Sequence, residues 1–192
     1  MVDSGESPVE PRPGVPRQAV LFGEEQPELP PDDVGYRGTV ACSAAGITYR
    51  QLDYWARTGL VAPTVRGAHG SGSQRLYSFR DVLVLKVVKR LLDTGVSLHN
   101  IRVAVEMLRA RGVGDLAQIT LLSDGATVYE CTSQDEIIDL LAGGQAVFGI
   151  AVGRVVREME GELAQLPSER ADGAAMIGAD ELAARRQRRT SA

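Results

Sequence analysis

The chain has 192 residues and a mass of 20.5 kDa, with 44% hydrophobic and 24% charged side chains and a net charge of −4. This composition is typical of a globular protein, and no stretch approaches the roughly 18 consecutive apolar residues of a membrane-spanning helix. The first residues lack the apolar core of a secretory signal, and Cys42 and Cys131 lie far apart in no paired motif. We therefore expect a cytoplasmic protein with no membrane segment, no metal cluster and no cofactor.

The charge is distributed unevenly along the chain. Residues 36–112 carry 12 basic and 4 acidic side chains, a net charge of +8, and each flanking region has a net charge of −6. A basic segment of this kind indicates a polyanionic partner such as nucleic acid, although a solvated helical surface can also be basic.

Residues 1–35 form the first predicted region. They combine seven prolines with eight acidic side chains. Because proline lacks a backbone N–H and like charges repel, we expect a disordered acidic leader.

The sequence VACSAAGITYRQLDYWARTGLVAP, residues 40–63, predicts two helices that are separated by a turn at Gly46. Thr48 and Gln51 have the spacing of a capping box, which starts the second helix. Gly59 marks its end.

The second helix has two chemically different faces. Its predicted inward face consists of Leu52, Trp55, Ala56 and Gly59. Its predicted outward face consists of Arg50, Asp53, Tyr54 and Arg57, with Tyr49 in the first turn. Guanidinium and phenol groups hydrogen-bond phosphates and base edges, and the amino end of a helix attracts phosphate. The same face could also be a solvated ladder of ion pairs.

A Gly- and Ser-rich loop with short β-prone flanks follows, and it carries Arg66, Arg75 and Tyr77. A helix-turn-helix followed by a basic loop is a winged arrangement, in which the second helix enters the major groove and the wing touches the backbone. The alternative is an enzyme with a phosphate cradle in GAHGSGS and His69 as a base. It is weaker, because the Gly-Lys-Ser/Thr ending of a P-loop is missing, and we predict no catalytic function.

Two further helices are predicted next. Ser78 and Asp81 repeat the capping box, Gly95 ends the first of these helices, and Ser97 caps the second. The first helix carries a polar stripe of Lys86, Lys89, Arg90 and Asp93. The buried stripe of the second is predicted at Leu98, Ile101, Val105 and Leu108.

The order of these motifs over residues 38–110 resembles the MerR family of bacterial transcription regulators. The matching elements are Ala45–Gly46–Ile47, Leu52, Tyr54 followed by an aromatic residue, Gly59–Leu60–Val61 with Pro63, Arg75-x-Tyr77, Asp81, and Gly95-x-Ser97-Leu98 with Ile101. The resemblance implies a winged helix-turn-helix on a homodimer that binds a near-palindromic operator in double-stranded DNA. Family members often bend and untwist promoters so that RNA polymerase can engage them, and others repress. The DNA contacts that the resemblance implies are Tyr49, Arg50, Tyr54, Arg57, Arg75 and Tyr77, and Arg66 of the wing is a further candidate.

The chain departs from the family pattern at several positions. Asp53 stands where the family usually has an arginine, and a carboxylate cannot bind phosphate and at best accepts from a cytosine amino group. We expect Asp53 to orient Arg50 or Arg57, one turn to either side. Trp55 replaces a usual tyrosine and is expected to pack inward, and the wing is longer and richer in glycine than usual.

After Gly114 the pattern changes. The sequence ITLLSDGATVYECT predicts two strands around an Asp-Gly turn, and Ser133 with Glu136 forms a third capping box. QAVFGIAVG is then either a strand or the start of a helix through Glu162. The predicted fold class is thus a mainly α winged helix-turn-helix domain, residues 36–112, followed by a small α+β domain, residues 115–165, in place of the long coiled-coil helix of many family members.

The distal region carries weaker functional signals. Cys131 is expected to be a small core residue, so metal or oxidant sensing is not predicted. The α+β domain is expected to supply the dimer interface, and its binding of a small-molecule effector stays open because Tyr129 and Phe148 are expected to pack in the core. Residues 166–192 are expected to form a disordered tail. Alternative functions are an architectural or excisionase-like DNA-binding protein without transcriptional output, and an adaptor that binds only proteins.

Overall fold

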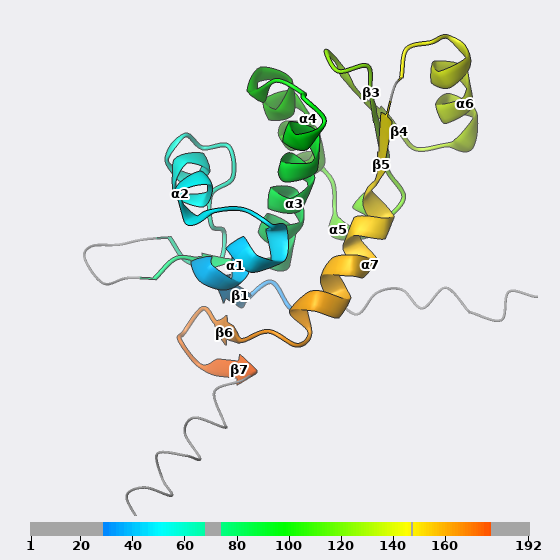
Figure 1. Ribbon diagram of the computed structural model, residues 1–192. Helices are drawn as coiled ribbons and strands as arrows, with labels where there is room; N and C mark the ends of the chain where they lie inside the picture. The colour runs from blue at the N-terminus through cyan, green and yellow to red at the C-terminus, as the bar shows by residue number, and fades with distance from the viewer. Residues whose placement is uncertain (1–28, 68–73, 147, 178–192) are drawn as a thin grey trace, which may run out of the picture.

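The computed structural model describes residues 29–67, 74–146 and 148–177. Within these ranges the chain forms seven helices and two small antiparallel sheets (Figure 1). Most of the predicted leader, the end of the predicted tail and the middle of the wing with His69 lie outside the described residues. None of the helices in the described ranges is long and apolar enough to cross a membrane.

The helix-turn-helix forms as predicted. Its elements are β1 (Val34–Arg37), α1 (Gly38–Ala45) and α2 (Tyr49–Arg57). The turn is built on Gly46, whose φ of +70° lies in the left-handed region that glycine adopts without strain. Thr48 and Gln51 form the predicted capping box reciprocally, which fixes where α2 begins.

The wing is a short hairpin that ends in β2 (Leu76–Tyr77) and pairs with β1. The backbone N–H groups of Arg66 and Leu76 each donate to the other residue's carbonyl, at 3.2 and 2.9 Å. Asp81 anchors the start of the wing, because its buried carboxylate accepts hydrogen bonds from the backbone N–H and the hydroxyl of Thr64, both at 2.8 Å. Asp81, which completes the capping box of the following helix, therefore also positions the wing.

The two following helices are α3 (Phe79–Asp93) and α4 (Leu98–Ala110). The predicted buried stripe of α4 is confirmed at Ile101, Val105 and Leu108 and is wrong at Leu98, which is 38% exposed. Leu98 directly follows the N-cap, where its side chain lies outside the packed turns of the helix. In the polar stripe of α3, Lys86 pairs with Glu162 and Arg90 with Glu158.

The distal elements are α5 (Val113–Leu116), β3 (Thr120–Ser123), β4 (Val128–Cys131), α6 (Gln134–Ala142), β5 (Phe148–Ala151) and α7 (Val152–Leu163). The predicted Asp-Gly hairpin is β3–β4, and the sheet order is β4-β3-β5. The segment QAVFGIAVG contains both predicted alternatives, since it forms β5 and then begins α7. Gly153 permits this junction, because a Cβ there would lie 2.1 Å from the carbonyl oxygen of Ala117.

One hydrophobic cluster extends from the helix-turn-helix into the distal elements, although α6 lies outside it. It joins α1, α2 and α3 to α7, which lies along α3 on the side away from α2 (Figure 1). Leu116, Val155 and Met159 belong to the same cluster as Leu52 and Trp55. The predicted boundary between residues 112 and 115 is therefore crossed by a continuous core.

The expected disorder from residue 166 onward is wrong for two segments, β6 (Ser168–Arg170) and β7 (Ala175–Ile177). β6 pairs with β1, so the winged sheet has the order β2-β1-β6-β7, and β1 itself includes the last two residues of the predicted leader. The carboxylate of Glu169 forms ion pairs with Arg37 and Arg66. The strands have only three residues each, and β6 is polar throughout, so no apolar alternation in the sequence indicated them.

Candidate nucleic-acid interface

Helix α2 is anchored by two side chains. Leu52 is 1% and Trp55 is 3% exposed, and both belong to the core cluster, as their spacing predicts. Of the other residues placed on the inward face, Ala56 is half-buried and Gly59 is exposed at the turn after the helix. The packing of Trp55 agrees with its expected structural role.

The opposite face of α2 is open to solvent. Tyr49 is 61% and Tyr54 is 47% exposed, and Arg50 and Arg57 are also exposed. Arg50 forms no ion pair within the described ranges, so its guanidinium is available there to an external acceptor. The predicted outward face thus gathers two cations and two phenols on one short helix.

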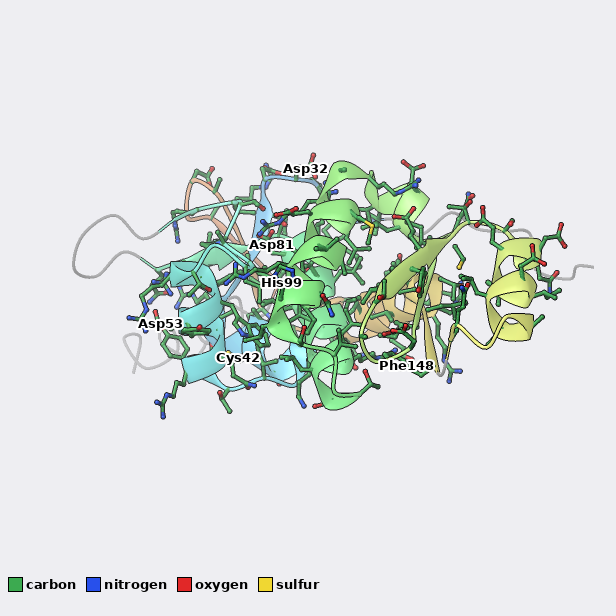
Figure 2. The ribbon with its side chains drawn as sticks, turned by 90° about the horizontal axis from the view of Figure 1, so that it is seen from above. Asp32, Cys42, Asp53, Asp81, His99 and Phe148 are labelled. Carbon is green, nitrogen blue, oxygen red and sulfur yellow. The ribbon has the colours of Figure 1, made fainter. Side chains whose placement is uncertain are left out.

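Asp53 connects this helix to the wing. Its carboxylate accepts from Arg57 Nε at 3.0 Å and from Arg75 Nη1 at 2.9 Å. Of the two expected partners, the structure brings Arg57 to Asp53, and it adds Arg75 from the wing. Hydrogen bonding to Asp53 raises the pKa of the Arg75 guanidinium. The carboxylate therefore holds one cation of the helix and one of the wing side by side, at the end of the molecule where Figure 2 labels Asp53.

The other two wing candidates lie elsewhere. Arg66 donates from Nε to the carbonyl of Gln74 at 3.2 Å and forms an ion pair with Glu169 at 3.6 Å, so it is directed toward β6. Tyr77 is fully buried, and its predicted DNA contact is corrected to a core position. Burial raises the pKa of Tyr77 to about 12. Strand alternation would place both residues of the wing signature Arg-x-Tyr on one face. They differ because Arg75 lies before β2 and pairs with Asp53, whereas Tyr77 lies within β2 and packs in the core.

A pocket of about 440 Å³ lies between the amino end of α1, α2 and the wing. Its lining includes Arg37, Thr39, Tyr49, Asp53 and Arg75. The first turn of α1 has no side-chain cap, so this end of the helix presents backbone N–H groups. Sequence patterns did not single out Arg37, because its role depends on the pairing of β1 with the wing.

Helix α4 also holds the carboxyl end of α2. Arg102 donates to the carbonyl of Thr58 at 3.2 Å and Arg109 to that of Gly59 at 3.4 Å. Cations at the carboxyl end of a helix satisfy its last carbonyls and complement its dipole. Their spacing of seven residues on one helix face was a detectable signal, but their target could not be read from the sequence.

The distal residues that the sequence singled out are divided between core and surface. Cys131 is buried, and burial raises the pKa of its thiol. Phe148 packs against the core cluster as expected. Tyr129 is half-buried and lies outside that cluster, so the expectation that it packs in the core is wrong.

Comparisons with known proteins identify the family to which the chain is similar. Residues 36–108 match the family described as MerR HTH family regulatory protein. The chain is 66% identical over 179 residues to the HTH-type transcriptional regulators Rv1830 of Mycobacterium tuberculosis and Mb1861 of Mycobacterium bovis, covering 89% of this chain and 80% of each relative. It is 30% identical over 83 residues to the HTH-type transcriptional regulator HmrR of Sinorhizobium medicae, covering 42% of this chain and 54% of HmrR. The chain belongs to the MerR family of helix-turn-helix transcriptional regulators.

Proposed function

We propose that the protein regulates transcription as a homodimer that binds a near-palindromic promoter operator and bends or untwists it. In this proposal α2 enters the major groove, with Tyr49, Arg50, Tyr54 and Arg57 directed at the DNA. Arg75 of the wing contacts the backbone. The observation that carries the proposal is the exposed polar face of α2, joined to Arg75 through Asp53.

The chemistry of this surface fits duplex DNA. A guanidinium can donate two hydrogen bonds to guanine in the major groove, and arginine and tyrosine both donate to phosphate oxygens. The pocket beside α1 combines Arg37, Arg75 and an uncapped helix amino end. Such a site suits a backbone phosphate.

A homodimer with twofold symmetry binds an operator that has the same twofold symmetry. Two recognition helices of a symmetric dimer read half-sites about 34 Å or a multiple of that distance apart. The proposal therefore requires two chains per operator.

Genome-wide mapping of bound sites, with transcription measured in a deletion strain, tests the regulatory function. We expect the bound sites to be promoters that contain inverted half-sites. Transcription from these promoters should change when the gene for this protein is deleted. Reintroducing the parent gene should restore it, whereas the Arg50→Ala variant should not. Occupied sites without any change in transcription would instead indicate the architectural alternative. In solution, binding to the mapped operator should weaken steeply with salt, by about one unit of log–log slope for each phosphate contact.

A further inference from the structure

Arg66 lies at the base of the wing, where its guanidinium joins three segments of the chain. Its Nε donates across the wing to the carbonyl of Gln74 at 3.2 Å, and its Nη1 donates to the carbonyl of Ala171, just after β6, at 3.5 Å. Its Nη2 forms an ion pair with the carboxylate of Glu169 in β6 at 3.6 Å. All three nitrogens of this side chain are thus directed into the molecule, and they connect the wing to the strand that follows α7.

The carboxylate of Glu169 is the centre of this connection. One of its oxygens pairs with Arg66, and the other pairs with Arg37, the last residue of β1. The side chain of Glu169 is 13% exposed. Ion pairs that are partly withdrawn from water are screened by salt much less than exposed pairs. A single carboxylate therefore holds a cation of β1 and a cation of the wing.

The hairpin that carries Glu169, β6 with β7, is fixed to the rest of the protein through β1. Glu169 pairs with Gly35 in the register of the two strands, and the backbone N–H of Ala171 donates to the carbonyl of Asp33 at 2.8 Å (Figure 1). These contacts do not involve the wing, so the hairpin is an independent support against which the wing can be held. It lies outside residues 36–108, the part of the chain that matches the family model.

The contacts of Arg66 lead directly to the proposed DNA contact of the wing. Gln74, whose carbonyl accepts from Arg66, immediately precedes Arg75. Arg75 in turn donates to Asp53 of α2 at 2.9 Å. A hydrogen bond to a phosphate oxygen weakens steeply when its distance or angle departs from the optimum, so the orientation of the wing decides how well Arg75 can bind.

We propose that Glu169 is a positioning residue for DNA binding. Through Arg66 it holds the wing in the orientation in which Arg75 contacts the DNA backbone. The inference rests on the proposed function, which assigns this contact to Arg75. It gives the β6–β7 hairpin a role in DNA recognition, and it ties the wing to the distal part of the chain, because β6 follows α7.

Double-variant cycles on the full chain test this role. The effect of Arg75→Ala on the Kd for the mapped operator duplex is measured in the parent and in Glu169→Gln, Arg66→Met and Glu130→Gln. Glu130 is the matched control, because its side chain is 12% exposed and pairs with Arg111 in the distal part of the chain. We expect Arg75→Ala to weaken binding roughly tenfold in the parent and in the control, the effect of one charge-assisted hydrogen bond. In the other two backgrounds the effect should shrink to less than about threefold, because residues that act through one element are not additive.

Each cycle compares two chains with the same background, so any general gain or loss of charge cancels. Circular dichroism verifies that every variant is folded, and Arg66→Met carries the test if Glu169→Gln does not fold. A tenfold effect of Arg75→Ala in all backgrounds, or a reduced effect in Glu130→Gln as well, would overturn the positioning role but leave the DNA contact of Arg75 intact. A reduction in Glu169→Gln without one in Arg66→Met would assign the coupling to Arg37 and overturn the role of the wing. Arg75→Ala without effect in the parent would instead contradict the wing contact of the proposed function.

Discussion

Helices α2 and α6 are alike in length and in how they begin, yet they present opposite chemistry to solvent. Each has nine residues and starts at a hydroxyl residue in a capping box. α2 buries Leu52 and Trp55 and exposes cations and phenols, whereas α6 buries no residue and exposes Ile138 and Leu141. The ends of a helix are therefore set by local residues, whereas the surface against which it packs depends on which of its faces the rest of the chain covers.

The largest expected effect is on the free energy of unfolding, which should respond differently to substitutions in α2 and α6. Leu52→Ala should lower the free energy of unfolding by about 2–5 kcal/mol, because it leaves a cavity in the core. Ile138→Ala should lower it by less than about 0.5 kcal/mol at concentrations where the chain is monomeric, because its side chain is already exposed. Urea unfolding followed by circular dichroism measures both, and equal losses would contradict the contrast.

The next prediction sharpens the role of the polar face of α2. Arg50→Ala should weaken operator binding by about 1–3 kcal/mol and relax base preference, because it removes a cation that has no ion-pair partner among the described residues. Arg75→Ala should weaken operator and unrelated duplexes about equally and lower the salt slope by about one unit. Fluorescence anisotropy with both duplexes across a salt series makes the measurement. If both variants bound like the parent, the assignment of helix and wing would be wrong.

A smaller effect is expected where the helix and the wing meet. Asp53→Asn keeps the shape of the side chain but removes the charge that holds Arg57 and Arg75. The exchange should strengthen binding to unrelated duplexes and reduce the operator preference, each by roughly 0.5–1 kcal/mol, the range of partly exposed ion pairs. Competition between operator and unrelated DNA measures this ratio. An unchanged ratio would mean that Asp53 does not orient the two arginines.

The smallest predicted effect concerns pH and α6. Backbone N–H groups of Thr132 and Ser133 lower the pKa of Glu136. The stabilisation of α6 by the ionised Glu136 carboxylate is therefore fully present above the ordinary glutamate pKa of about 4.3. It is lost as pH falls through the lowered pKa of Glu136 in the folded chain. Amide hydrogen exchange in α6 should accelerate relative to that of α3 in this acidic range. In Glu136→Gln this pH dependence should disappear, and its persistence would assign the effect to another group.

The local elements of this protein could be predicted from residue patterns alone. The capping boxes at Thr48, Ser78 and Ser133 start α2, α3 and α6, and the Asp-Gly hairpin forms as its turn residues require. The motif order also identified the family. These signals suffice because caps and turns depend on contacts within about four residues, which a single sequence displays directly.

The contacts that join these elements became visible only in the folded structure. Asp53 received a second partner, Arg75, from 22 positions away, and Tyr77 proved to be buried behind it. β6 returned from the end of the described chain to pair with β1 through a short polar strand. The exposure of α6 likewise depends on which surfaces the core leaves uncovered. Contacts between residues so distant in sequence leave no periodic trace in either partner, because they are fixed by the packing of whole elements on a shared core.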